Sequence, residues 1–174
     1  CRQALSIPVY PHPMHRLLQG DVGCGKTVVM ALCIAAAIQS GWQAALMAPT
    51  ELLAEQHARV ASAYLEPLGI RVSLISQGVS AAERAKATKA IASGAIAVVI
   101  GTHALLQRSL TFHRLSLVII DEQHKFGVAQ RARLAKKAQR PDVLVLTATP
   151  IPRTLALSLY GDLAASTITE LPPG

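Results

Sequence analysis

The sequence predicts an α/β domain whose mostly parallel sheet is covered by helices on both faces. Short apolar runs alternate with longer segments of helical pattern through most of the 174 residues, and this alternation is typical of parallel strands joined by helical crossovers. Glycine-rich or polar segments directly follow three of the apolar runs. In parallel α/β sheets, ligands bind beyond the carboxyl ends of the strands, so these three segments are expected to share one edge.

Each element is expected from a local pattern. Apolar runs predict strands at 17–19, 44–48, 72–76, 97–100, 117–120, 143–146 and 166–169. Helical patterns predict helices at 27–40, 51–65, 81–93 and 128–138. The third helix has the clearest ends, because Ser80 and Glu83 form a capping-box pattern and Gly94 suits the residue after the last turn.

One segment has the pattern G-x-x-x-x-G-K-[ST] of a phosphate-binding loop. It consists of Gly20, Asp21, Val22, Gly23, Cys24, Gly25, Lys26 and Thr27. Its glycines allow successive N–H groups to point at a phosphate, and the apolar helix that follows presents its positive end to the same anion. Lys26 is expected to reach the β and γ phosphates, and Thr27 to coordinate Mg²⁺.

A second candidate site follows the apolar run 117–120. It consists of Asp121, Glu122, Gln123 and His124. Asp121 is expected to hold Mg²⁺ through water, while Glu122 orients or deprotonates the water that attacks the γ-phosphate. Two adjacent acids are also compatible with an ordinary strand end. Their position after a strand, together with the phosphate-binding loop, favours the catalytic interpretation.

A third candidate site follows the apolar run 143–146 and consists of Thr147, Ala148 and Thr149, before Pro150. The threonine hydroxyls are expected to hydrogen-bond to His124 and so to respond to bound phosphate. The alternative is a strand that simply enters a turn.

Composition and charge indicate which classes of protein and partner are compatible with this sequence. The longest apolar run, 28–38, is 11 residues, whereas a membrane span needs about 20. The three cysteines form no C-x-x-C pair, which fits a reducing cytosol. Residues 80–140 hold 11 Lys and Arg against 3 Asp and Glu (+8), and the remainder holds 6 against 7 (−1). This basic region suits an acidic polymer such as nucleic acid, or is a solvated helical surface.

Taken together, the three sites resemble motifs I, II and III of the RecA-like motor core of superfamily 2 helicases. The run from Pro49 to Ala54 (PTELLA) resembles motif Ia, and the run from Gly101 to Leu106 (GTHALL) resembles the next nucleic-acid-contacting motif. The segments LQGDVG, DEQHKFGV and TPIPRTLA, with YGDL and ELPPG near the end, are similar to the RecG branch-migrating DNA helicases. The transcription-repair coupling factor is the alternative family, although its motif II normally has Glu where this chain has Gln123.

The resemblance implies roles for these residues. Lys26 and Glu122 would be catalytic, and the cofactors would be ATP and Mg²⁺, the latter held by Thr27 and Asp121. The expected DNA contacts are Pro49, Thr50, Glu51, Gly101, Thr102 and His103. Alternatives remain open for two of these residues: Thr50 also suits a plain helix N-cap, and His103 a buried, hydrogen-bonded histidine.

The resemblance also implies a domain organisation. Residues 1–15 would be a lead-in and residues 16–174 the first RecA-like motor domain, with a wedge domain before it and a second motor domain after it. The expected partners are branched double-stranded DNA (forks and Holliday junctions) and those two domains of a monomeric, bacterial, cytoplasmic parent. The arginine finger would lie in the second motor domain. The alternative for this chain in isolation is therefore a module that binds nucleotide and DNA without hydrolysing ATP. A P-loop small-molecule kinase shares the loop but fits Asp-Glu-Gln-His poorly.

Overall fold

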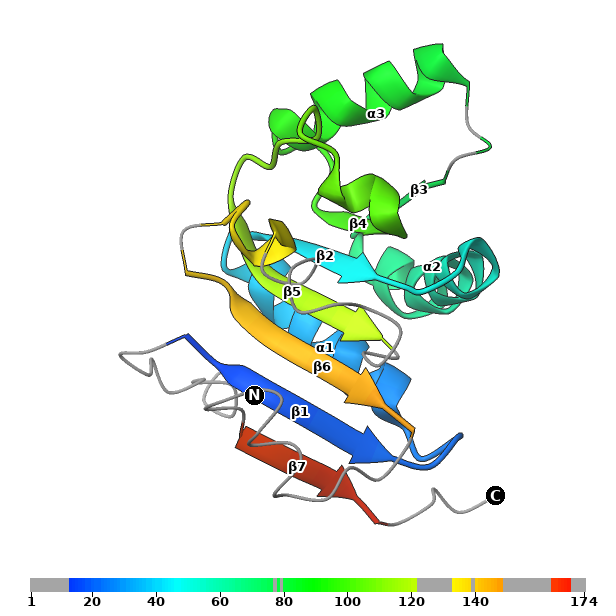
Figure 1. The fold of residues 1–174 in the computed structure, drawn as a ribbon, viewed down its shortest axis with the longest axis vertical. Helices are drawn as coiled ribbons and strands as arrows, with labels where there is room; N and C mark the ends of the chain where they lie inside the picture. Colours follow the sequence, from blue (N-terminus) through cyan, green and yellow to red (C-terminus); the bar gives the residue numbers. More distant parts are fainter. Residues whose placement is uncertain are drawn as a thin grey trace.

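The computed structural model describes residues 13–76, 78, 80–121, 133–138, 140–148 and 164–169. These residues form one seven-stranded sheet in the order β3-β4-β2-β5-β6-β1-β7 (Figure 1). The strands are β1 His15–Gly20, β2 Gln43–Met47, β3 Val72–Ile75, β4 Val98–Gly101, β5 Leu115–Asp121, β6 Asp142–Thr147 and β7 Ala164–Ile168. Every described pairing is parallel. All seven predicted strands are confirmed, with ends that differ by at most two residues.

Three of the four predicted helices are confirmed as α1 Lys26–Gln39, α2 Glu51–Leu65 and α3 Ala81–Ala92. In the fourth predicted helix, 128–132 lie outside the described residues and 133–135 are helical. Two short 3₁₀ helices, η1 Glu66–Leu68 and η2 His103–Leu106, were not predicted.

The predicted capping box of α3 is present. The Ser80 side chain accepts from the Glu83 N–H, and the Ser80 N–H donates to Glu83 Oε2 at 3.2 Å. Hydrogen bonds from the Ser80 hydroxyl and N–H lower the pKa of the Glu83 carboxyl. Gly94, just beyond the helix, has a φ of 82°, a conformation that glycine adopts without the cost a Cβ would impose.

Both faces of the central strands are buried. Alternate residues of the central strands enter two apolar clusters, as in β2, where Ala44 and Leu46 face one way and Ala45 and Met47 the other. Residues of α1 and α2 join the first cluster, whereas Ile91 of α3, Leu105 of η2 and Leu134 join the second. This two-sided burial explains why the strands are continuous apolar runs rather than alternating ones.

The strand order places the predicted sites next to one another. The strands β5, β6 and β1 are neighbours, and the register pairs Gln19 with Thr147 and Asp121 with Leu146. Because all the pairings are parallel, the phosphate-binding loop after β1, Thr147 at the end of β6 and Asp121 at the end of β5 meet at one edge. The expectation from the strand-end positions is therefore confirmed for the described residues.

Candidate nucleotide and DNA site

The loop between β1 and α1 has the backbone that a phosphate-binding loop requires. Gly23 and Gly25 have φ values of 84° and 93°, and a Cβ built on either would meet nothing within 4 Å. Gly20 is restricted differently, since a Cβ there would lie 2.4 Å from the buried Cys24 Sγ. Gly23 and Gly25 are therefore favoured by their backbone conformation, and Gly20 by the lack of space for a side chain.

The positive charge of the loop comes from Lys26 and the start of α1. The Lys26 ammonium donates to the carbonyl oxygens of Gly20 at 2.6 Å and Asp21 at 2.7 Å, so it lies against the loop itself. Gly25 is the N-cap of α1; it supplies no side-chain cap, and the first turn has no acidic residue. The N–H groups at this helix end, the ammonium and the two open glycines fit a phosphate chain. Thr27 is half-buried in the first turn of α1.

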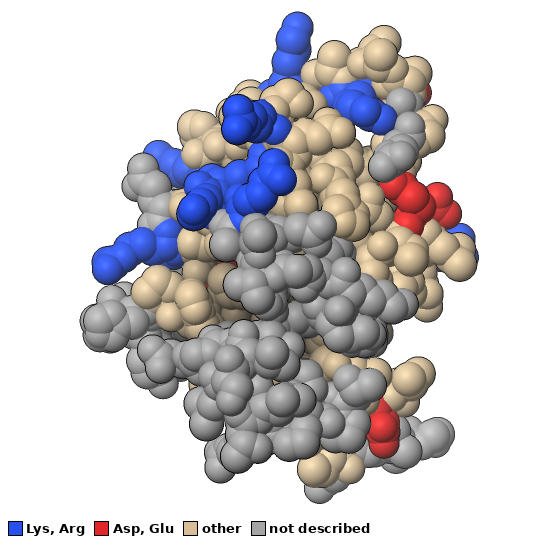
Figure 2. All heavy atoms as spheres, in the orientation of Figure 1, with Lys and Arg blue, Asp and Glu red and all other residues tan. Residues whose placement is uncertain are grey.

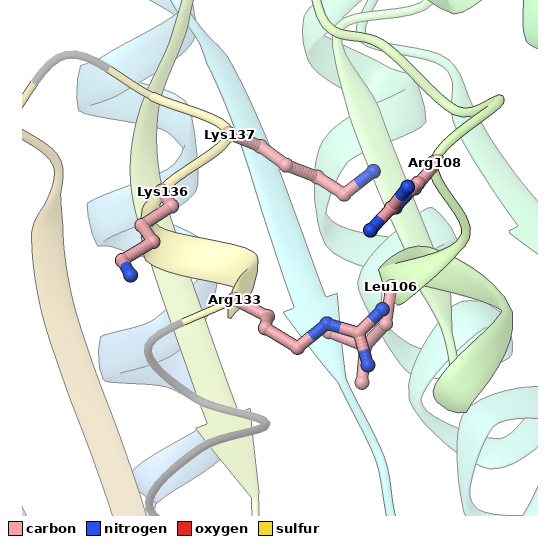
Figure 3. A pocket seen from close by; sticks show the side chains of 5 residues that line it. All are labelled: Leu106, Arg108, Arg133, Lys136 and Lys137. Carbon is pink, nitrogen blue, oxygen red and sulfur yellow. The ribbon is translucent and has the colours of Figure 1, made fainter.

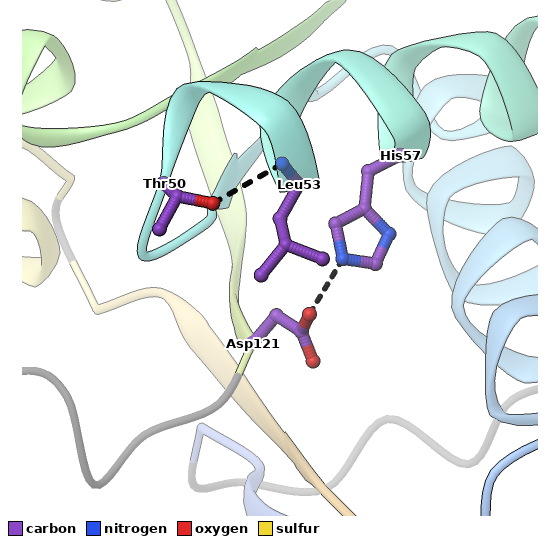
Figure 4. Close-up of polar contacts among 4 residues, drawn as sticks. All are labelled: Thr50, Leu53, His57 and Asp121. Atoms are coloured by element: carbon purple, nitrogen blue, oxygen red, sulfur yellow. Dashed lines mark hydrogen bonds and ion pairs between the residues drawn. The ribbon is translucent and has the colours of Figure 1, made fainter.

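Asp121 is the last residue of β5 and makes a contact that the sequence did not predict. Its Oδ2 lies 2.5 Å from His57 Nε2 of α2 (Figure 4). The two side chains are 12% and 15% exposed, so the hydrogen bond is largely shielded from water. This contact holds the carboxylate at the sheet edge through Oδ2.

The described residues at this edge do not form a metal site from protein ligands alone. Among the described residues, no group of three or more His, Cys, Asp and Glu is arranged to hold a metal ion. Mg²⁺ commonly binds one or two carboxylates together with substrate phosphates and water. Asp121 and Thr27 fit that mode, in which most ligands come from outside the protein.

Thr147 ends β6 between the other two strand ends and is 1% exposed. Ala148 follows it and is half-buried. Four predicted site residues lie outside the described residues: Glu122, Gln123, His124 and Thr149. The predicted hydrogen bond between the threonines and His124 stays a prediction.

The residues predicted to contact DNA lie at the same edge, after β2 and β4. Thr50 is exposed and is the N-cap of α2, with its hydroxyl accepting from the Leu53 N–H at 3.2 Å (Figure 4). The Thr102 hydroxyl donates to Glu51 Oε1 at 3.1 Å, so the two predicted DNA-contacting segments are joined. The interpretation of Thr50 as an N-cap is confirmed.

Pro49, Gly101 and His103 complete the predicted set. His103 is exposed, so the alternative of a buried histidine is wrong. Gly101 is buried, and a Cβ on it would lie 2.6 Å from the Ile75 carbonyl oxygen. The close approach of β3 therefore explains why residue 101 is a glycine. Pro49 is half-buried in the turn before α2.

Helix α2 consequently touches both parts of the site. Its first turn is hydrogen-bonded to Thr102, and its second turn holds Asp121 through His57. The sequence analysis missed His57. A signal was present, because His57 lies three residues after Ala54 and four before Ala61, on the buried stripe of the helix. A histidine on such a stripe needs a polar partner.

The fold and the site define a P-loop NTPase domain of the RecA-like type. The DEAD/DEAH box helicase model matches residues 2–157, and the chain therefore belongs to this helicase family. Curated relatives named ATP-dependent DNA helicase RecG are 54% identical in Synechocystis, 52% in Bacillus subtilis and 54% in Escherichia coli K12. The alignments cover 93–94% of this chain but only 20–24% of the relatives.

Solved structures agree. RecG bound to a three-way DNA junction is 47% identical with a TM-score of 0.80, over 93% of this chain and 22% of that one. A DEAD box protein from Methanococcus jannaschii has a TM-score of 0.69 at 20% identity, over 89% of this chain and 46% of that one, which supports the fold alone. The predicted resemblance to the RecG helicases is confirmed, and the coupling-factor alternative is not favoured. No described helix is long and apolar enough to span a membrane.

Proposed function

We propose that this chain is the first motor domain of an ATP-dependent DNA helicase that unwinds and branch-migrates forks and Holliday junctions. One observation carries the proposal: the phosphate-binding loop, Thr147 and Asp121 lie at the ends of three neighbouring parallel strands. The RecG structure that is 47% identical to this chain is bound to a three-way DNA junction, which supports branched DNA as the substrate. The parent is proposed to be bacterial, cytoplasmic and monomeric.

The nucleotide site is proposed to bind ATP with Mg²⁺. Gly20 to Thr27 would hold the phosphates, with the Lys26 ammonium exchanging its two carbonyl partners for phosphate oxygens. Mg²⁺ would neutralise charge developing on the transferred phosphoryl group. Thr27 and Asp121 would hold it, and His57 is a positioning residue that fixes the Asp121 carboxylate. Glu122 would orient the attacking water, and Thr147 with Thr149 would couple the site to His124.

The DNA would lie across the ends of β2 and β4. Thr50 begins a helix, and helix N-termini and bare backbone N–H groups suit the phosphates of a nucleic-acid backbone. The Glu51–Thr102 hydrogen bond holds this surface together, and α2 connects it to Asp121. Such contacts would not read base sequence.

The proposed domain organisation keeps residues 1–15 as a lead-in and 16–174 as the motor domain. The chain spans 20–24% of the length of the RecG relatives above. The wedge domain and the second motor domain, with the arginine finger, are proposed to be supplied by the remainder of the parent. An absent arginine finger costs about 10³–10⁵ in rate, so the 174-residue chain is expected to bind nucleotide with little turnover.

Titration with a fluorescent ATP analogue in Mg²⁺, with phosphate release followed in parallel, tests this function. Lys26→Ala should weaken binding at least about tenfold, because a hydrogen bond to a charged group contributes about 1.5–3 kcal/mol. Lys86→Ala, an exposed lysine on α3, is the matched control. Glu122→Gln should retain binding and lose any hydrolysis. Equal binding by the Lys26 and Lys86 variants, with both folded, would refute the nucleotide site.

A further inference from the structure

Four basic residues line a hollow that the nucleotide site does not use. The hollow is about 440 Å³ and is lined by Arg108, Arg133, Lys136, Lys137 and Leu106 (Figure 3). We call these five residues the basic hollow. Arg108 and Lys137 point toward one another, whereas the Lys136 side chain points away from the other three basic side chains.

Two segments far apart in the sequence build the basic hollow. One follows η2 and the other is 133–138, and buried Leu110 and Leu134 anchor them in the same apolar cluster. The Lys137 ammonium joins them by donating to the carbonyl oxygens of Gln107 at 2.6 Å and Leu110 at 2.5 Å. The cations are therefore gathered by the fold rather than by adjacency in the chain.

The charge of the basic hollow is uncompensated within the described part of the chain. No acidic residue of the described segments lines it, and the exposed side chains of Arg108, Arg133 and Lys136 make no hydrogen bond or ion pair with a described residue. Burial and the neighbouring Arg133 lower the pKa of Lys137. Like charges held this close repel one another, and an anion that binds among them relieves that repulsion.

The surrounding surface has the same sign. Lys and Arg gather over the upper left of the face in Figure 2, around the segment that Figure 1 draws in yellow, whereas the visible Asp and Glu lie along the opposite side. Leu106, which lines the hollow, is the last residue of η2, and η2 begins at His103. Helix η2 therefore connects the segment predicted to contact DNA with the basic hollow.

We propose that the basic hollow binds the phosphate backbone of double-stranded DNA and extends the contact of Gly101, Thr102 and His103. This inference rests on the proposed function, which supplies DNA as the acidic partner. Duplex DNA carries one negative charge per about 1.7 Å of axis, so several cations on one surface meet several phosphates. Arg108, Arg133 and Lys136 contact phosphates, while Lys137 holds the two segments together and adds its charge. Contacts of this kind position the duplex without reading its sequence.

A charge-matched comparison tests the proposal. Fluorescence anisotropy with a labelled blunt duplex, over about 50 to 200 mM salt, compares the unsubstituted chain with the triple variant Arg108→Gln, Arg133→Gln, Lys136→Gln. The control triple is Arg71→Gln, Lys86→Gln, Lys89→Gln, which removes the same charge from exposed positions just before β3 and on α3. Lys137 is left intact because it also supports the fold.

The hollow triple should reduce the slope of log K against log salt by about 2.7, since each lost phosphate contact contributes about 0.9. That corresponds to a loss of up to about 500-fold in affinity at about 0.1 M salt. The control triple should leave the slope close to that of the unsubstituted chain. Circular dichroism melting confirms that both variants are folded.

Three outcomes overturn the proposal: equal losses in the two triples, an unchanged slope in the hollow triple, or no duplex binding by the unsubstituted chain. Competition by poly-glutamate at lower concentrations than the duplex would also overturn it, in favour of an acidic protein. ATP-analogue binding by the unsubstituted chain and by Lys26→Ala is measured in the same buffer. Lys26-dependent nucleotide binding without duplex binding would reject the basic hollow and leave the ATP site standing.

Discussion

The contact between His57 and Asp121 makes the sharpest prediction for the nucleotide site. His57→Ala removes the hydrogen-bond partner of Asp121 Oδ2 and leaves the carboxylate free to rotate at the end of β5. Partners that orient a metal-binding carboxylate are worth about 10–100-fold in metal affinity or activity. The variant should therefore weaken the binding of nucleotide with Mg²⁺ while leaving metal-free nucleotide binding unchanged.

The burial of the pair sets the expected magnitude. A hydrogen bond to a charged group contributes about 1.5–3 kcal/mol. Because the His57 and Asp121 side chains are only 15% and 12% exposed, most of that free energy is retained. At about 1.4 kcal/mol per tenfold, the upper limit on the effect is about 10- to 140-fold. His57→Gln retains a side-chain donor and should recover part of the loss.

The assay is a Mg²⁺ titration of ATP-analogue binding, repeated in the presence of EDTA. Arg59→Ala is the control, because Arg59 is exposed on the same helix. An unchanged Mg²⁺ requirement in His57→Ala would refute the positioning role. A lower requirement would show that His57 competes with the metal for Asp121, which is the opposite of the role proposed.

Two further predictions concern stability. Gln43 is 3% exposed, donates to the carbonyls of Ile91 and Ile96 and accepts from the N–H groups of His113 and Arg114. Gln43→Leu should lower the urea-derived free energy of unfolding by at least about 3 kcal/mol, since each buried unsatisfied group costs about 1–3 kcal/mol; a loss as small as that of exposed Gln56→Leu would contradict this. The pKa of Lys137 in the folded chain lies below the ordinary value of 10.5 that applies in the unfolded chain. At a pH between the folded and unfolded pKa values, the unfolded chain binds more protons than the folded chain, so the free energy of unfolding rises with pH. The free energy of unfolding of the unsubstituted chain minus that of Lys137→Met should therefore increase as the pH approaches 10.5, and a constant difference would argue against a lowered folded pKa of Lys137.

Several features of this protein are local and could be predicted from the sequence. The central strands are continuous apolar runs because both faces of the sheet are buried there, and this pattern can be recognised without knowing which strands pair. The phosphate-binding loop is equally local: positive φ values at Gly23 and Gly25 and the Lys26 charge are properties of eight consecutive residues. The capping box at Ser80 and Glu83 is read from a spacing of three.

Other features depend on which strands become neighbours, and the sequence pattern does not contain that order. Asp121 and the loop ending at Thr27 lie at one edge of the sheet, next to each other, because only β6 separates β5 from β1. His57 contacts Asp121, which is 64 residues away in the sequence, and Lys137 contacts Gln107, which is 30 residues away. Hydrophobic periodicity specifies that a residue is buried but not what it will touch. The strand order and the packing of α2 and 133–138 against the sheet decide those contacts, and with them both the orientation of Asp121 and the basic hollow.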